Sequence, residues 1–169
     1  MSEACGGAPS AAIARWAPLV PQGGEVLDLA AGSGRHTLLF LARGHAVTAV
    51  DRDVSALRQL AHDRLTVLDA DLENAPWPLP GRTFAGVVVS NYLWRPLLPT
   101  IVAAVAPGGV LLYETFAVGN ERFGRPRNPD FLLRSGELLD AVRGELEVRE
   151  YWCGEEGAAV RQRVCAVRV

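Results

Sequence analysis

Asp28 and the small residues that follow it form the segment best suited to bind a ligand. Asp28 lies near the end of an apolar run, residues 25–29, and a turn of small residues follows at 30–34. Glycines tolerate positive φ angles and let a ligand approach the backbone closely. A helical pattern comes next, and the first turn of a helix offers free N–H groups to an anion. We therefore expect a nucleotide-like ligand here. The turn residues expected to contact it are Ala30, Gly32, Ser33 and Gly34.

Polar residues also follow the other predicted strands. Short apolar runs predict further strands at residues 46–51, 65–69, 84–90 and 110–114. In a parallel sheet with helices on both faces, the ligand lies outside the carboxyl ends of the strands. The residues expected at that edge after the first strand are Asp51, Arg52, Asp69, Asp71, Leu72, Ser90, Asn91 and Glu114.

Several of these side chains suit an adenosine group. Asp51 lies 23 residues after Asp28, where a carboxylate can accept two hydrogen bonds from a ribose diol. Asp71 can accept a hydrogen bond from an exocyclic amine, and the Leu72 amide can donate to a ring nitrogen. The Arg52 guanidinium can stack on a purine face.

The remaining pattern completes an α/β domain. Helices are predicted at residues 11–19, 34–43, 53–62 (capped by Asp53), 97–105 and 136–143, with a tight turn at 107–109. A hairpin is predicted from residues 146–152 and 159–169. The fold class is therefore a Rossmann-like, doubly wound α/β sheet of seven strands, mostly parallel, with an antiparallel strand in the C-terminal hairpin. We expect one domain over residues 1–169, with an N-terminal helix within 1–22 and a substrate lid loop at 115–135.

The composition of the chain argues against several classes of binding partner and chemistry. The 169 residues carry 17 basic and 19 acidic side chains, a net charge of −2, which does not favour nucleic acid. No lysine is present, so Schiff-base chemistry on a side chain is excluded. The three cysteines, Cys5, Cys153 and Cys165, lack metal-ligand spacing, so we expect no metal and a cytoplasmic location. No apolar stretch is long enough for a membrane span.

The chain resembles the class I S-adenosylmethionine-dependent methyltransferases from about residue 25 to the C-terminus. The resemblance lies in the glycine-rich segment 28–34, the acids within 49–52 and 69–72, and the turn 107–109. It implies S-adenosyl-L-methionine as cofactor and in-line transfer of a methyl group to a small-molecule acceptor. Compact size and Gly34-Arg35-His36 are similar to the small tellurite-resistance and thiopurine type. Ala30 replaces the usual first glycine.

Two other functions fit the same motif. A nucleotide- or dinucleotide-binding oxidoreductase would use a related glycine pattern, although Thr37 stands where its third glycine belongs. A non-catalytic module could bind S-adenosylmethionine without turning it over, and the lack of an evident general base is the support for that alternative.

The acceptor-binding residues are the least defined. Arg35 and His36 begin a helix, where a packed or solvated His36 is favoured over an acceptor or base role. Tyr92 and Trp94 follow the fourth strand and could equally be core aromatics. Three arginines of the predicted lid suit either an anionic group or a solvated loop. No residue is assigned a catalytic role, although Tyr113, Glu114 and His36 are candidate bases. The full set of candidate acceptor residues is Arg35, His36, Tyr92, Trp94, Tyr113, Glu114, Arg122 and Arg125.

Overall fold

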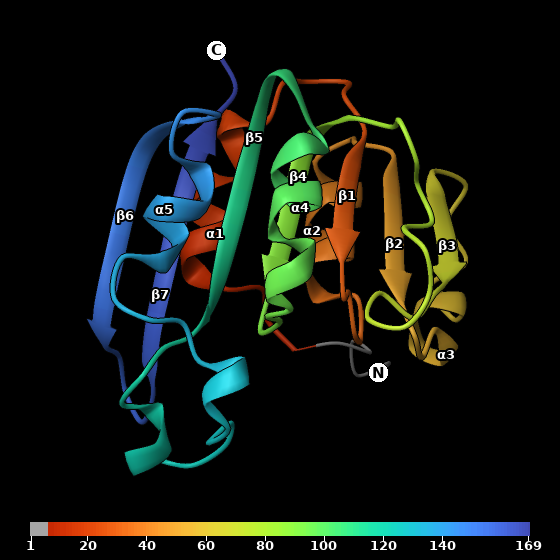
Figure 1. Cartoon of the computed structure of the whole chain (residues 1–169). Coiled ribbons are helices and arrows are strands. Elements are labelled where there is room, and N and C mark those ends of the chain that lie inside the picture. The colour runs from red at the N-terminus through yellow and green to blue at the C-terminus, as the bar shows by residue number, and fades with distance from the viewer. Residues whose placement is uncertain (1–6) are drawn as a thin grey trace.

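The computed structural model describes residues 7–169 and contains one seven-stranded sheet in the order β3-β2-β1-β4-β5-β7-β6 (Figure 1). β7 runs antiparallel to both of its neighbours, and the other adjacent strands are parallel. This confirms the predicted fold class. The strands are β1 (Val26–Leu29), β2 (Val47–Asp51), β3 (Leu65–Asp69), β4 (Phe84–Ser90), β5 (Val105–Phe116), β6 (Glu147–Glu155) and β7 (Val160–Val167).

Helices cover both faces of the sheet, as Figure 1 shows. One hydrophobic core lies under α4 (Leu98–Ala103) and α5 (Glu137–Val142). The other lies under α1 (Ala11–Trp16) and α2 (Arg35–Ala42), and α3 (Ser55–Arg58) packs on β2. Within residues 7–169, no helix has both the length and the apolar character needed to cross a bilayer.

The two-residue period of the strands decides which side chains reach which core. In β1, Leu27 and Leu29 enter the core under α4 and α5, whereas Val26 enters the core under α1 and α2. Successive side chains of a strand point to opposite faces, so Asp28 shares the face of Val26. Asp28 therefore points toward α2 rather than toward α4.

The prediction of a helix over residues 53–62 is wrong in length. The observed helix α3 spans only Ser55–Arg58, and its N-cap residue is Val54 rather than Asp53. Asp53 instead accepts hydrogen bonds from the amide and hydroxyl of Ser55. A helix that continues to residue 62 is excluded, because Ala61 has a positive φ of 44°.

The tight turn predicted at 107–109 is replaced by a bent strand. β5 already begins at Val105, and its pairing with β4 shifts register between Phe84 and Gly86. Gly108 has a φ of 74° and donates a backbone hydrogen bond of 2.7 Å to the carbonyl of Arg168. A positive-φ glycine thus bends the strand without interrupting it.

The predicted lid region is an ordered loop. β5 runs on to Phe116, and two short 3-10 turns follow at Asn120–Arg122 and Pro129–Phe131. Ala117 forms an isolated parallel bridge with Leu133, which brings the two ends of the loop together. The helix expected within residues 1–22 is α1, and Cys5 lies outside the described residues.

Candidate active site

A cavity of about 360 Å³ opens at the carboxyl ends of the parallel strands, where the strand order reverses between β1 and β4. This is the switch point at which open α/β sheets bind ligands. The structure brings six of the predicted donor-site residues together there. The lining consists of Ala30, Asp51, Arg52, Ala70, Asp71, Leu72, Glu73, Asn91, Tyr92 and Phe131.

The small-residue turn after β1 lies beside this cavity in a left-handed conformation. Ala30, Gly32 and Gly34 have φ angles of 53°, 58° and 86°. A Cβ atom at Gly34 would lie 2.9 Å from the end of the Leu60 side chain, which can move, so the left-handed φ is the main reason for glycine here. Ala30 adopts its positive φ despite a Cβ atom, which stores strain at the edge of the cavity. Ser33 is exposed at the same turn.

Asp51 connects this turn to the end of β2. One carboxylate oxygen accepts a hydrogen bond from the Gly32 amide at 2.8 Å, and the other accepts one from the Asp53 amide at 3.0 Å. A carboxylate has about four lone-pair positions, so each oxygen can accept a further hydrogen bond. Asp51 is therefore held in place while it still faces the cavity with acceptor capacity.

Asp71 is fixed in a similar way at the other side of the cavity. Its carboxylate accepts hydrogen bonds from the Asn74 side chain and from the Glu73 and Asn74 amides. The Asn74 side-chain hydrogen bond is the main cause of a lowered pKa, with the two amides and the Arg52 charge adding to it. Asp71 thus remains an ionised acceptor.

Asp28 has a structural contact rather than a place in the cavity lining. Its side chain is 2% exposed and accepts a hydrogen bond of 2.6 Å from the Thr37 hydroxyl in the first turn of α2. Burial raises the pKa of Asp28 to about 6, against the lowering effect of Thr37 and Arg35. Asp28 therefore orients the start of α2 beneath the small-residue turn.

The Tyr92 hydroxyl is a buried polar atom without a hydrogen-bond partner in the described chain. Tyr92 lines the cavity, and burial together with the nearby charges of Glu73 and Asp71 raises its pKa. A buried neutral hydroxyl costs free energy unless it is paired. A polar ligand in this cavity would supply that partner, so the residues present fit an adenosine group.

A second cavity of about 220 Å³ adjoins the first and shares four residues with it. Its own lining adds Phe116 and Thr115 from the end of β5 and Pro126 from the loop. The two cavities therefore offer neighbouring spaces for two ligands. The shared residues are Glu73, Asn91, Tyr92 and Phe131.

Two arginines contact the end of β4. Arg35 donates a hydrogen bond of 3.0 Å to the Ser90 hydroxyl, and Arg161 donates one of 2.7 Å to the Asn91 side-chain oxygen. Asn91 has a φ of 55°, which directs its side chain away from the regular strand path. Ser90 and Asn91 were expected at this edge and Arg35 was a candidate acceptor residue, whereas Arg161 was not predicted.

The three candidate bases are buried outside both cavity linings. His36 accepts a hydrogen bond from the Ser10 amide, and burial with the Arg35 charge lowers its pKa to about 4. The Tyr113 hydroxyl donates to the Tyr92 carbonyl, and burial raises its pKa. Glu114 is 3% exposed, with Arg163 3.5 Å away.

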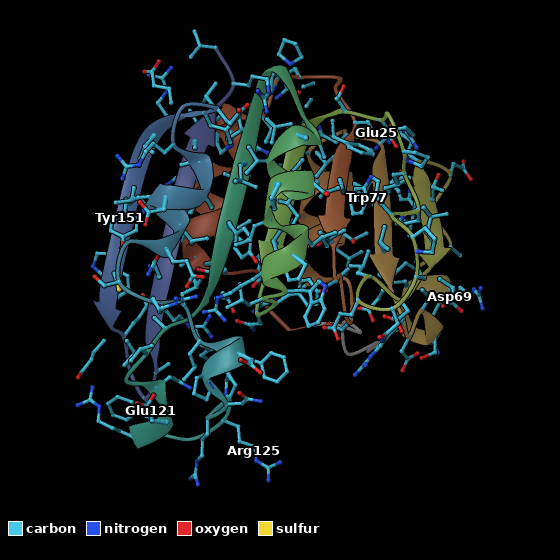
Figure 2. All side chains as sticks on the ribbon, in the orientation of Figure 1. Glu25, Asp69, Trp77, Glu121, Arg125 and Tyr151 are labelled. Atoms are coloured by element: carbon cyan, nitrogen blue, oxygen red, sulfur yellow. The ribbon has the colours of Figure 1, made fainter. Side chains whose placement is uncertain are left out.

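The other candidate acceptor residues are dispersed. Trp94 packs against the core beside α4. Arg122 forms an ion pair of 2.5 Å with Glu155, and both side chains are exposed. Arg125 lies at the far end of the loop, as Figure 2 shows, and lines a shallow hollow with Phe131. In this structure the lid arginines do not face the first cavity.

Sequence reasoning missed Phe131, Glu73 and Arg161. Phe131 and Glu73 lie in segments without regular periodicity, so no pattern signalled their position. A signal existed for Arg161, because β7 is antiparallel and its first residues must lie beside the carboxyl ends of its neighbours.

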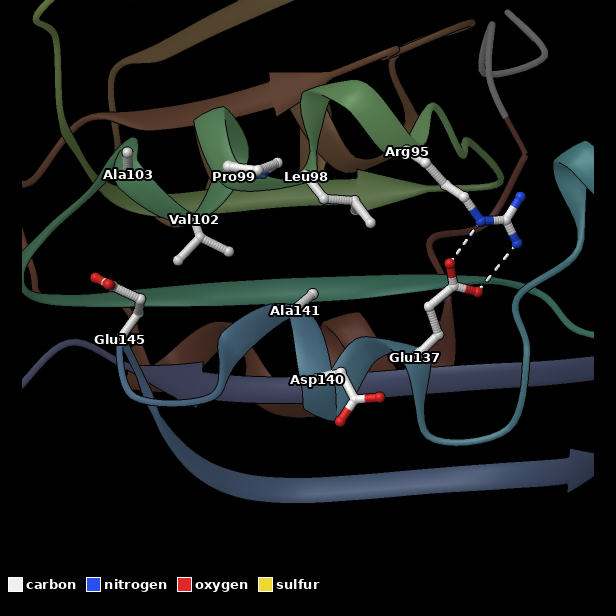
Figure 3. A pocket seen from close by; sticks show the side chains of 9 residues that line it. All are labelled: Arg95, Leu98, Pro99, Val102, Ala103, Glu137, Asp140, Ala141 and Glu145. Atoms are coloured by element: carbon white, nitrogen blue, oxygen red, sulfur yellow. Dashed lines mark hydrogen bonds and ion pairs between the residues drawn. The ribbon is translucent and has the colours of Figure 1, made fainter.

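A larger hollow, about 550 Å³, lies elsewhere, between α4 and α5 (Figure 3). The ion pair between Arg95 and Glu137, 2.6 Å long, closes one end of it. Leu98, Val102 and Ala141 contribute apolar surface. None of the predicted site residues lines this hollow, so it does not compete with the strand-end cavities as the candidate active site.

Comparison with known proteins agrees with the geometry of the sheet edge. Residues 26–109 match the family model described as a methyltransferase domain. Malonyl-[acyl-carrier protein] O-methyltransferase of Serratia marcescens is 34% identical over 140 residues, which is 76% of this chain and 48% of that protein. The chain thus spans about half the length of this relative.

Solved structures share the fold. The 1,6-didemethyltoxoflavin-N1-methyltransferase of Burkholderia thailandensis, solved with S-adenosylhomocysteine, has a TM-score of 0.70 at 19% identity, covering 94% of this chain and 76% of its own. TehB of Haemophilus influenzae has a TM-score of 0.71 at 19% identity, covering 92% of this chain and 61% of its own. Residues 26–109 therefore match a methyltransferase domain, and the chain has the fold of these solved methyltransferases.

Proposed function

We propose that this chain transfers a methyl group from S-adenosyl-L-methionine to a small-molecule acceptor. The observation that carries the proposal is the cavity at the switch point, where Asp51 and Asp71 flank the buried, unpaired Tyr92 hydroxyl. Two acceptor groups and one unpaired hydroxyl match the ribose and adenine of an adenosyl ligand.

Each half of the donor has a place in this proposal. Asp51 binds the ribose diol, while Asp71, the Leu72 amide and the Arg52 guanidinium surround the adenine. The methionine half lies along the small-residue turn, beside the end of β4. The residues that would hold this half are Ala30, Gly32, Ser33, Gly34, Ser90 and Asn91, with Asp28 orienting the turn from below.

The second cavity is the proposed acceptor site. When bound, S-adenosylmethionine supplies a methyl group that is already activated by a positive sulfur. The residues of the chain then have to align the acceptor at about 3–3.5 Å from the methyl carbon and exclude water. Tyr92 and Phe131 line both cavities and would contact both ligands. The loop at 115–135 is proposed as the lid over this space.

No general base is included in the mechanism. His36 and Tyr113 already use their ring nitrogen and hydroxyl in hydrogen bonds within the fold, and Glu114 lies beside Arg163. An acceptor that reacts as an anion, such as a thiolate or a chalcogen oxyanion, needs no proton removal at the site. This favours a small acceptor of that kind, in line with the tellurite-resistance and thiopurine type.

The proposal also covers the class of acceptor and the cellular location. The net charge of −2 supports a small molecule rather than nucleic acid as acceptor. Three sparse cysteines support a cytoplasmic location.

Calorimetric titration with S-adenosylhomocysteine and with NADH tests the donor site. We expect saturable binding of S-adenosylhomocysteine and no binding of NADH. The reverse result would assign the chain to the nucleotide-binding oxidoreductases. Turnover of methyl-labelled S-adenosylmethionine with a pool of thiols and chalcogen oxyanions then tests catalysis, because a non-catalytic module would bind the donor without consuming it.

A further inference from the structure

The end of β4 carries two guanidinium groups whose hydrogen-bond partners there are neutral. Arg35 donates to the Ser90 hydroxyl at 3.0 Å and to the Ala8 carbonyl at 3.4 Å. Arg161 donates to the Asn91 side-chain oxygen at 2.7 Å. Ser90 and Asn91 are consecutive, so the two positive charges flank a single strand end.

Neither guanidinium forms an ion pair with a carboxylate within residues 7–169, in contrast to the neighbouring arginine of β7. Arg163 lies 3.5 Å from Glu114 and also pairs with Glu156. Glu114 is 3% exposed, so this ion pair is internal to the fold. Arg163 therefore has carboxylate partners within ion-pair distance, whereas Arg35 and Arg161 have none within residues 7–169.

Arg161 is also partly withdrawn from solvent. Its guanidinium lies 4.3 Å from the centre of the Phe116 ring. Burial is the main cause of its lowered pKa; the nearby charges of Glu114 and Glu156 raise the pKa, and those of Arg163 and Arg35 lower it. A partly desolvated guanidinium binds an oxyanion more strongly than an exposed one does, because water competes less for the charge.

The position of Arg161 relates it to the second cavity. Its two contacts, Phe116 and Asn91, both line that cavity. Neither of the acids proposed for adenosine, Asp51 and Asp71, lines it. Arg35, by comparison, directly follows Gly34 in the turn proposed for the methionine half of the donor.

We propose that Arg161 binds an oxyanion of the methyl acceptor, such as a carboxylate, at the rim of the second cavity. This inference deepens the proposed function and depends on it. The oxyanion would replace the missing carboxylate partner of Arg161, and the Phe116 ring would keep the guanidinium plane in position. Acceptors with an anionic group would then be selected over neutral molecules of the same shape.

Calorimetry on protein saturated with S-adenosylhomocysteine tests this, with malonate as the probe and malonamide as its uncharged counterpart. We expect malonate to bind the wild-type protein and malonamide not to bind. Arg161→Gln should weaken malonate binding by about 10–100-fold, the range for losing hydrogen bonds to a charged group. The matched control is Arg143→Gln, which removes an equal charge from an exposed pair with Asp140 and should leave malonate binding unchanged.

A second variant keeps Arg161 but gives its guanidinium a carboxylate partner within the protein. Asn91→Asp would place a carboxylate where the neutral oxygen now lies, 2.7 Å from the Arg161 guanidinium. Aspartate tolerates the positive φ of this position. Malonate binding should again fall by about 10-fold or more. Melting temperatures of all variants confirm that the fold is intact.

Three results would overturn the inference. The first is no malonate binding by the wild-type complex, and the second is equal malonate binding by Arg161→Gln. The third is a loss of S-adenosylhomocysteine affinity in Arg161→Gln without a loss for 5′-methylthioadenosine, which lacks the amino-acid carboxylate and would assign Arg161 to the donor. Failure of the wild-type protein to bind S-adenosylhomocysteine would instead refute the proposed function itself.

Discussion

The carboxylate of Asp51 accepts a hydrogen bond from the Gly32 amide at 2.8 Å, which joins the end of β2 to the turn that follows β1. A second backbone link runs from the Ala31 amide to the Val50 carbonyl at 3.0 Å. The turn and the proposed ribose acceptor are therefore parts of one hydrogen-bonded unit. A change at Asp51 should affect donor binding both directly and through the shape of the turn.

We predict that Asp51→Ala weakens S-adenosylhomocysteine binding by about 1–3 kcal/mol, because it removes charge-assisted hydrogen bonds. Calorimetric titration measures the change. Asp69→Ala is the matched control, since Asp69 is the register partner of Asp51 on β3, is exposed and does not line the cavity. Equal affinity of Asp51→Ala and wild type would refute the ribose assignment.

Ala30→Gly should raise the free energy of unfolding by up to about 1 kcal/mol. A left-handed φ costs a residue with a Cβ atom about 1–2 kcal/mol, and the greater freedom of glycine in the unfolded chain returns part of that gain. Thermal or urea unfolding measures the difference. Ala31→Gly, one residue further on without a positive φ, should instead be neutral or destabilising. Destabilisation by Ala30→Gly would show that the Cβ atom makes a contact that outweighs the strain.

The raised pKa of Asp28 predicts how the free energy of unfolding changes with pH. Its folded-state pKa of about 6 lies above the ordinary value of 3.8, so the folded state binds a proton more tightly than the unfolded state. The stabilising effect is complete below 3.8 and is lost as the pH rises through about 6. An asparagine at this position would still accept from the Thr37 hydroxyl and would stay neutral at every pH. Asp28→Asn should therefore gain about 1–3 kcal/mol over wild type at pH 7, with little difference near pH 4.

Urea unfolding of both proteins between pH 4 and pH 7 measures this difference. Subtracting the two curves removes the contributions of other groups, including His36 and its lowered pKa of about 4. A difference that stays constant with pH would mean that Asp28 has the same pKa in the folded and unfolded states.

Arg95 should control the order of the proposed lid. Its guanidinium donates hydrogen bonds to the Glu137 carboxylate and to the carbonyls of Pro129, Asp130 and Leu132. Arg95→Gln removes most of these bonds from a pair that is 26% and 15% exposed, so we expect a stability loss of about 1–3 kcal/mol.

Hydrogen exchange measures the local effect of Arg95→Gln, with faster exchange expected in residues 129–137 than in the strands. Arg143→Gln is again the control, because its exposed ion pair should contribute less than about 0.5 kcal/mol. Unchanged exchange in this segment would show that the bridge between Ala117 and Leu133 holds the loop without Arg95.

The strands were the most predictable part of the fold. β3 and β4 have the predicted limits, because each is an apolar run bounded by polar residues or breakers. The limits of α3 and β5 were not predictable in this way. α3 ends at Arg58, before the left-handed φ of Ala61, and Gly108 donates a hydrogen bond to distant Arg168 where β5 bends. The local pattern signals neither the φ of Ala61 nor the contact with Arg168.

Some residues of the candidate site could also be predicted from the sequence, and others could not. Asp51, Asp71 and Asn91 could be predicted because each lies at or just after the end of a strand, and parallel strands end at one edge. Phe131 could not be predicted, since it lies in an irregular loop, and Arg161 could be placed only once β7 was known to be antiparallel. The position of His36 against Ser10 also requires the packing of α1 on α2, which no local pattern reveals.

The antiparallel direction of β7 has an evolutionary implication. Because this strand begins where its neighbours end, it delivers Arg161 to the cavity edge from the opposite end of the chain to the Asp28–Asp51 segment. Under the proposed roles, mutations near Arg161 would alter which acceptor binds while the Asp51 and Asp71 contacts proposed for adenosine stay in place. Related enzymes could thus diversify their chemistry through one half of the polypeptide while the other half stays unchanged.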